Sequence, residues 1–282
     1  MAGNAAPSGQ GGGAYLGSFS NFCVNNTVYD NENGIGGGGL SLFTLGTANI
    51  YNNIVFANSA PAASGQDILI GGPATSGALF NNDFGEACVN DGMTVNCDPT
   101  TVANFTTGAN INVDPLFVDA PNANFNLAEG SQAIDAGDVN APDLPATDHD
   151  GNPRVVNGQV DMGALEAQPN IVTDPASLDF GDIGGNKSSS LSLIIANVGS
   201  LPADVSGLVL SDTVNYSLDL NAGSDPCAAS SFTLPGGNNC TLSVIFSPKQ
   251  NGLFNATLTI NSNDPDEPAL AVPLSGSAQA GG

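Results

Sequence analysis

The chain has 282 residues, which is long enough for one large domain or two ordinary ones. Its 27 Asp and Glu against 3 Lys and Arg give a net charge of −24, so the surface repels phosphate groups and binding to nucleic acid is disfavoured, as is binding to an anionic membrane. Charged residues make up 11% of the chain, and 36 Gly with many Asn, Thr, Ser and Val predict an all-β fold rich in turns. The sequence contains no run of eighteen apolar residues, so no membrane span is predicted.

Residues 1–13, MAGNAAPSGQGGG, lack the charged segment and the apolar core of a signal peptide. We therefore expect a longer secreted protein whose N-terminal part is missing from this sequence. Either missing upstream coils or a strand from a neighbouring chain would cover the unpaired backbone of the first coil. Residues 1–13 and 276–282 look free enough to reach such a neighbour, so self-association into a polymer is a second prediction.

A repeat runs through the first third of the chain. The glycine run at residues 11–13 recurs at 37–39, and Asn-Asn pairs recur at 25–26, 52–53 and 81–82. A period in the twenties with short β-rich segments and Gly or Asn corners predicts a solenoid of stacked coils. Side-chain amides on successive coils would then form a ladder, with Asn26, Asn53 and Asn82 as its rungs. The alternative is a β-sandwich in which the Asn pairs recur by chance.

The five cysteines form two close pairs and one residue left over. Cys88 and Cys97 flank a predicted Asp-Gly turn, and Cys227 and Cys240 flank a longer loop. Neither pair has the spacing of a zinc ribbon or a CxxC redox site, so we predict two disulfides and an oxidising compartment. Cys23 is predicted to be a free, buried thiol.

Residues 147–166, TDHDGNPRVVNGQVDMGALE, contain the only histidine and the only arginine among four acidic residues. As a general base His149 would need a Ser or Cys motif that is absent, so no catalytic residue is predicted. Asp148 and Asp150, with Asp138 upstream, are candidate calcium ligands, although the later ligands of an EF-hand loop are missing.

The favoured interpretation of this stretch is structural. Asp148 and Asp150 would cap the turn at Gly151, and Arg154 would pair with a carboxylate such as Asp161 or Glu166. The segment would then close the solenoid.

The second half of the chain has a different pattern. Residues 167–171 are predicted to form a linker, and residues 172–282 show apolar residues alternating with polar ones between turns. About seven strands in a segment of this size predict an immunoglobulin-like β-sandwich. The last strand contains Pro273, which has no N–H to donate, so this strand is predicted to lie at a sheet edge.

Two family resemblances follow from these motifs. The elements DPLF, SQAIDAGD and DHDGNPRVVNGQVDMGALE resemble, in this order, the C-terminal end of bacterial pectin-lyase-like surface proteins of the choice-of-anchor Q group. This resemblance implies that residues 1–166 form a right-handed parallel β-helix. The segment LDFGDIGGNKSSSLSLIIANVGS and the sequence after it resemble the choice-of-anchor D or ASPM/SPD-2/Hydin-like domain, which implies a non-catalytic immunoglobulin-like module.

These features favour a non-catalytic secreted or cell-surface protein that serves in structure, adhesion or fibre assembly. The alternative is a carbohydrate-active or carbohydrate-binding β-helix protein, a hydrolase or lyase relative. A lyase is disfavoured because Arg154 is the only basic residue of the first domain, and sugar stacking is disfavoured because tryptophan is absent. A hydrolase needs only two carboxylates, so it stays open. No cofactor is predicted other than calcium, and a polysaccharide or cell-surface partner is expected.

Overall fold

The computed structural model describes residues 1–6, 11–72, 76–184 and 187–279. The chain divides into two compact units, Met1–Ala167 and Gln168–Gly282. The division lies at the start of the predicted linker, residues 167–171. Both units are built almost entirely of β-strands and turns.

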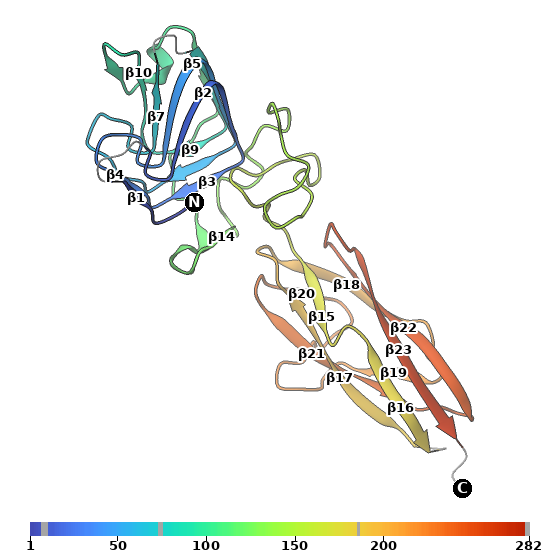
Figure 1. Cartoon of the computed structure of the whole chain (residues 1–282). Helices are drawn as coiled ribbons and strands as arrows, with labels where there is room; N and C mark the ends of the chain where they lie inside the picture. The colour runs from blue at the N-terminus through green and yellow to red at the C-terminus, as the bar shows by residue number, and fades with distance from the viewer. Residues whose placement is uncertain (7–10, 73–75, 185–186, 280–282) are drawn as a thin grey trace. The chain divides into compact units, whose positions relative to one another are not determined.

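The strands of the first unit stack in a solenoid-like arrangement (Figure 1). One sheet is formed by β2 (Ala14–Val24), β5 (Leu40–Tyr51), β7 (Ile68–Gly71), β8 (Ser76–Phe80), β10 (Ala87–Asn90) and β12 (Phe105–Gly108), with the antiparallel β11 (Val95–Asn96) beside β10. A second is formed by β3 (Thr27–Tyr29), β6 (Ile54–Phe56) and β9 (Asp83–Phe84), and a third by β1 (Ala5–Ala6) and β4 (Glu32–Asn33). Apart from β10–β11, all these pairings are parallel.

Register places apolar residues of successive coils over one another. Leu40 pairs with Ile68 and Leu42 with Ile70, and all four are buried in one core. Because alternate residues of a strand point to opposite faces, Phe43 next to Leu42 is exposed. The period-two pattern within each strand therefore puts the core on the inside of every coil.

The predicted asparagine ladder is present. The Nδ2 of Asn26 donates to the Oδ1 of Asn53 at 2.9 Å, and Asn53 donates in the same way to Asn82 at 2.9 Å. Asn82 donates in turn to Asn110 at 3.0 Å, a fourth rung that the sequence analysis missed. Each amide bonds its neighbour where the coil turns a corner, so the ladder fixes the stacking of four coils.

A second ladder runs along another corner and was also missed. Asn4 donates to Asn31 at 2.9 Å, and Asn31 donates to Asn58 at 2.9 Å. Asn58 then donates to the carboxylate of Asp67 at 3.0 Å. The second oxygen of Asp67 accepts backbone N–H groups of the next turn, including that of Gly85 at 2.7 Å. The ladder therefore ends at Asp67, whose two oxygens both accept hydrogen bonds.

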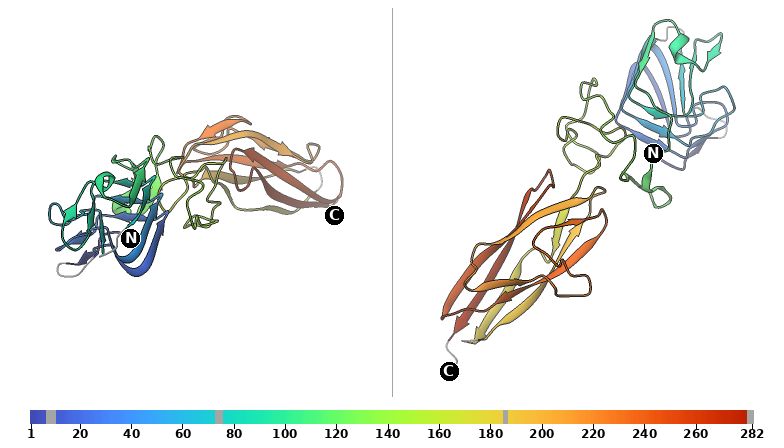
Figure 2. Two further views of the ribbon diagram at one scale, coloured as in Figure 1. Left: turned by 90° about the horizontal axis from the view of Figure 1, so that it is seen from above. Right: turned by 180° about the vertical axis from the view of Figure 1, so that it is seen from behind.

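The strands of the first unit are followed by a hairpin and a long strand-free segment. The hairpin consists of β13 (Phe117–Asp119), the 3-10 turn η2 (Ala120–Asn122) and β14 (Asn124–Leu127); another 3-10 turn, η1 (Pro99–Thr101), lies before β12. We call residues 128–167 the closing segment. It consists of turns and isolated bridges (Figure 2, yellow-green), and its Ala133 and Met162 pack with Ile54 and Leu127 in a small core.

Two antiparallel-rich sheets form the second unit. One contains β15 (Ile171–Asp174), β17 (Ser189–Asn197), β21 (Asn239–Phe246) and β19 (Tyr216–Asp219), in this order. The other contains β16 (Leu178–Gly184), β23 (Ala269–Gln279), β22 (Gly252–Ser262), β18 (Ala203–Leu210) and β20 (Phe232–Leu234). Inward side chains of both sheets share one hydrophobic core, so the unit is a β-sandwich.

Two sequence-based predictions for the second unit are wrong. The strand with Pro273, β23, lies inside its sheet between β16 and β22. Since β16 begins opposite Leu274, no residue of β16 lies opposite Pro273, and the missing N–H is tolerated there. Residues 276–279 belong to β23 and are not a free tail, whereas residues 280–282 lie outside the described part of the chain.

The N-terminal residues also differ from a flexible arm. Ala5 and Ala6 pair with β4, and Ala2 bridges to Tyr29, so residues 1–6 lie along the first coil. Residues 7–10 of the predicted arm are outside the described residues. The described residues of both predicted arms therefore pair with strands of the same chain, and the prediction that they are free to reach a neighbour is wrong for them.

Candidate functional site

The closing segment is held on one corner of the solenoid by three stacked asparagines. Asn25, Asn52 and Asn81 each precede a ladder residue and have positive φ angles of 52°, 57° and 53°. Asparagine adopts this left-handed conformation more readily than most residues. The turn points the three amides away from the ladder and toward the closing segment.

Each of these amides bonds backbone of the closing segment. Asn25 donates to the carbonyl of Asp161 at 2.8 Å, and Asn81 donates to that of Ala136 at 2.9 Å. Asn52 donates to the carbonyl of Asp138 at 3.0 Å and accepts the N–H of the same residue at 2.7 Å. The second residue of each Asn-Asn pair stacks the coils, and the first attaches the segment that closes them.

Arg154 lies at the centre of the closing segment with 2% of its surface exposed. Its Nη1 forms an ion pair with the Oε1 of Glu166 at 2.8 Å. Its two terminal nitrogens also donate to the backbone carbonyls of Gly163 and Ala164, at 3.2 and 2.8 Å. The arginine is therefore a buried cross-link in which three separate acceptors hold one guanidinium.

Asp161 and Glu166 are buried carboxylates with structural partners. Asp161 accepts the N–H groups of Asp135 and Ala167 at 2.7 and 2.6 Å, and its own N–H is donated to Glu166. Burial raises the pKa of Asp161 to about 6. Burial, with the charge of Asp161, raises the pKa of Glu166 to about 8, although Arg154 acts in the opposite direction.

Asp148 organises the turn of the DHDG motif, residues 148–151. Its Oδ1 accepts the N–H groups of Asp150 and Asn152, at 2.9 and 2.8 Å, and its Oδ2 accepts that of Glu166 at 3.1 Å. The cap at Gly151 thus belongs to Asp148, while the carboxylate of Asp150 is exposed and forms no hydrogen bond with any described residue.

The predicted calcium ligands do not converge in the described part of the chain. Asp148 is buried and saturated by N–H donors, Asp150 faces solvent, and Asp138 bonds the N–H of Asn140 at 2.8 Å. One cluster of three potential ligand residues exists among the described residues, Glu86 with Cys88 and Cys97. Its two sulfurs are joined in a disulfide and cannot act as thiolates, so this cluster is a poor metal site. Calcium binding stays a prediction.

Both predicted cysteine pairs are bonded in the structure, Cys88 with Cys97 and Cys227 with Cys240. Cys23 is a free thiol in the solenoid core. Burial raises its pKa to about 11, so the thiol is protonated at neutral pH and is a poor nucleophile.

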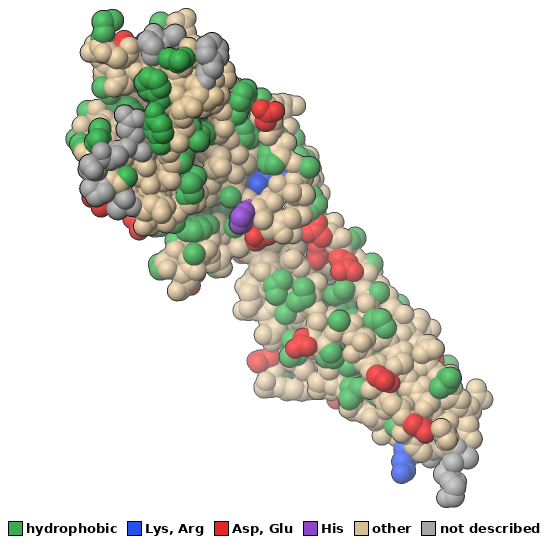
Figure 3. Space-filling model, viewed as in Figure 1, with side chains coloured by type: hydrophobic (Ala, Val, Ile, Leu, Met, Phe, Trp, Pro, Cys, Tyr) green, Lys and Arg blue, Asp and Glu red, His purple; other side chains and the backbone are tan. Residues whose placement is uncertain are grey.

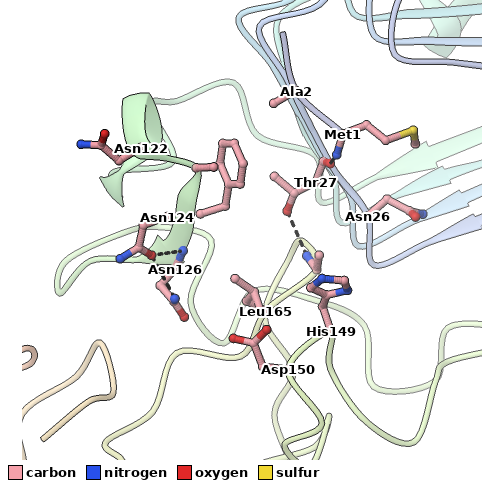
Figure 4. Close-up of a pocket in the computed structure, with 13 residues that line it drawn as sticks. Met1, Ala2, Asn26, Thr27, Asn122, Asn124, Asn126, His149, Asp150 and Leu165 are labelled. Atoms are coloured by element: carbon pink, nitrogen blue, oxygen red, sulfur yellow. Dashed lines mark hydrogen bonds between the residues drawn. The ribbon is translucent and has the colours of Figure 1, made fainter. Parts of the chain in front are cut away.

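A pocket of about 800 Å³ opens beside the DHDG turn. His149, purple in Figure 3, lies exposed at its edge together with Asp150. Figure 4 shows Asn124 and Asn126 of the hairpin on one side and Asp150 and Leu165 of the closing segment on the other. Asn26 and Thr27 of the first coil line the pocket as well, together with Met1 and Ala2.

The walls of the pocket are held by contacts among the lining residues and by aromatic rings behind them. The N–H of Ala164 donates to the hydroxyl of Thr27 at 3.0 Å, and that of His149 donates to the carbonyl of Ala164 at 2.9 Å. On the hairpin side, the ring of Phe125 packs against the rings of Tyr29 and Phe117, with centroids 5.8 and 5.3 Å apart. Three segments distant in sequence therefore meet in one hollow of the first unit.

Sequence analysis identified His149 and Asp150 but missed the hairpin. The signal was the alternation in NANFNL, residues 122–127, which predicts a short strand with Asn124 and Asn126 on one face and Phe125 on the other. This strand faces the DHDG turn because the closing segment folds back over it. No local sequence pattern predicts that fold.

No protein-family model matches the sequence, and no curated protein matches it. Among solved structures, a protein of unknown function from Porphyromonas gingivalis W83 aligns over 40% of this chain and 50% of its own, with 16% identity and a TM-score of 0.33. The PapD-like domain 7 of human CEP192 aligns over 45% of this chain and 97% of its own, with 16% identity and a TM-score of 0.31. The secreted serine protease VesC from Vibrio cholerae aligns over 40% of this chain and 23% of its own, at 14% identity and a TM-score of 0.30.

This chain therefore spans half the length of the first of these structures. None of the described helices is both long and apolar enough to cross a membrane. The two disulfides are compatible with an extracellular location.

Proposed function

We propose that the chain is a non-catalytic protein of the cell exterior, secreted or held at the cell surface, with a structural or adhesive role. In this proposal residues 1–166 are the end of a right-handed parallel β-helix, and residues 172–282 are an immunoglobulin-like accessory domain. The resemblances of the sequence and the solenoid-like and sandwich architectures support both assignments.

One observation carries the proposal, namely how the closing segment uses its charged side chains. Arg154, Asp148, Asp161 and Glu166 are each at most 7% exposed, and each is bonded to backbone groups that shape the segment. A catalytic group must reach a substrate, and these groups reach only the protein. These four charged side chains of residues 147–166 thus serve to hold the closing segment in shape.

The alternative is a polysaccharide lyase or hydrolase, and the described residues give it little support. A lyase would use a basic residue against a uronate, and the guanidinium of Arg154 is buried and paired. A retaining or inverting hydrolase needs two carboxylates about 5 to 10 Å apart on either side of the bond. Asp150 is the only carboxylate among the residues that line the pocket at the DHDG turn.

Self-assembly is the part of this proposal that is simplest to test. Strand β2 pairs with β5 on one side, and no described strand pairs with its other side, which leaves backbone groups along eleven residues for another chain. We expect electron microscopy of the purified chain, with millimolar calcium to screen its charge, to show linear multimers. Particles that stay monomeric at high protein concentration, with calcium and with chelator, would contradict self-assembly.

A further inference from the structure

We propose that the pocket at the DHDG turn binds a neutral sugar, one or two residues of an uncharged glycan. This inference rests on the proposed adhesive function and names its ligand class. The site is defined by Phe125, Asn124 and Asn126 of the hairpin and by His149, Asp150 and Leu165 of the closing segment.

The pocket contains polar atoms that the described fold leaves without partners. Asn126 donates its Nδ2 to the Oδ1 of Asn124 at 3.0 Å, which leaves the Nδ2 of Asn124 and the Oδ1 of Asn126 unbonded within the described residues. The imidazole of His149 and the carboxylate of Asp150 likewise have no hydrogen-bond partner there. These groups are one amide donor, one amide acceptor, one carboxylate and one imidazole. Sugar hydroxyls, which donate and accept at once, match this set.

The pocket also contains the apolar surface that a sugar ring requires. Phe125 is half-buried, and its ring is braced by Tyr29 and Phe117, so its position is set before any ligand arrives. Leu165 lies in the opposite wall (Figure 4). A pyranose presents C–H groups on its faces and hydroxyls around its edge, so one ligand can offer both an apolar surface to Phe125 and Leu165 and hydrogen-bonding groups to the polar side chains of the lining.

Charge selects against acidic ligands. Asp150 is unpaired in the pocket, and the first unit as a whole carries 17 acidic residues against one arginine that is itself buried. Uronates, sulfated glycans and phosphates would meet this field with no guanidinium or ammonium side chain among the lining residues. The α-ammonium of Met1 also lines the pocket, and it donates to the backbone carbonyl of Thr27 at 2.8 Å. An uncharged ligand avoids that repulsion.

Size and geometry favour binding over turnover. A volume of about 800 Å³ lies within the range of about 300–1,000 Å³ typical of small-molecule sites. With a single carboxylate in the lining, the pocket lacks the second group of a glycoside hydrolase. The ligand is therefore expected to leave unchanged.

The test is an array of neutral and acidic glycans probed with the whole chain, followed by calorimetric titration of the best neutral oligosaccharide. We expect neutral glycans to bind and acidic ones to fail. His149→Ala and Asp150→Ala should each lower the affinity about tenfold or more, because both side chains are exposed and free of fold contacts. Glu129→Ala is the matched control, since it removes an exposed carboxylate of the closing segment that does not line the pocket.

The outcomes separate this inference from the proposed function. Absence of binding to every neutral glycan, or binding that His149→Ala and Asp150→Ala leave unchanged, overturns the sugar site and leaves a structural role intact. Binding only to acidic glycans, or only to a peptide, also overturns it. Cleavage of a bound sugar, detected by chromatography of the titrated sample, would instead refute the non-catalytic function while keeping the site.

Discussion

At the scale of single residues, the acidic groups of the first unit act as hydrogen-bond acceptors for the backbone. Asp148, Asp161 and Asp67 each accept two or more N–H groups, which ionised carboxylates do better than neutral side chains. Asp83 is fully buried, and its Oδ2 has no partner among the described residues. Burial raises the pKa of Asp67, Asp83 and Asp161, and this makes the stability of the unit depend on pH.

The first unit should lose stability as the pH rises from 5 to 8. Burial raises the pKa of Asp83 and Asp161 to about 6 and that of Glu166 to about 8, above the values of the unfolded chain. The folded state then holds these protons more tightly, so their contribution is complete below about pH 4 and disappears as the pH passes the folded values. Calorimetry should show the melting temperature of the first unit fall across this range, and Glu166→Gln should reduce the slope. A melting temperature that rises toward pH 8 would contradict this account.

Removal of Arg154 should be among the most damaging single changes in the first unit. Arg154→Met leaves Glu166 buried without its cation, and the carbonyls of Gly163 and Ala164 each lose one of their two donors, so we expect a loss of about 3–5 kcal/mol at pH 8. The loss should shrink at pH 5, where Glu166 takes up a proton. Lys249→Met removes an exposed cation and should cost less than about 0.5 kcal/mol. Equal urea midpoints for the wild type and Arg154→Met would show that the buried pair does not contribute to the free energy of unfolding.

At the scale of elements, the Asn-Asn corners link local sequence to the stacking of coils. The pairs were visible in the sequence, and a ladder could be predicted because equivalent residues of stacked coils must meet. The fourth rung, Asn110, was missed because Ala109 stands where the other corners have an asparagine; it still adopts a positive φ of 53°. The contact of Asn25, Asn52 and Asn81 with residues more than fifty positions away could not be predicted, since nothing in a repeat identifies what packs outside it.

Position along the ladder should decide how much a rung contributes. Asn53 is fully buried, donates to the carbonyls of Cys23 and Tyr51 and to Asn82, and accepts from Asn26. We expect Asn53→Ala to destabilise the first unit by about 3 kcal/mol or more, because several buried groups lose partners together. Asn26→Ala, at the end of the ladder, should cost about 1 kcal/mol, the net worth of a typical hydrogen bond. Urea unfolding measures both, with exposed Asn140→Ala as control; equal costs for the two rungs would argue against a cooperative ladder.

At the scale of the whole molecule, composition sets the surroundings in which the chain can work. A net charge of −24 repels itself less when salt or divalent cations screen it, and two disulfides are compatible with an extracellular location. Composition and alternation were enough to predict an all-β chain. They could not predict that β23 lies inside its sheet, because the tolerance of Pro273 depends on where the neighbouring strand begins.

The central claim is that this chain has no catalytic function, and turnover is its most direct test. The purified chain would be incubated with neutral and acidic polysaccharides in millimolar calcium, and reducing ends and unsaturated uronates would be measured over time. We predict no product above that of a heat-denatured control, because Asp150 has no second carboxylate beside it among the residues that line the pocket, and the guanidinium of Arg154 is buried and paired. Sustained release of product that Asp150→Ala abolishes would contradict the account and place an enzyme at the DHDG turn.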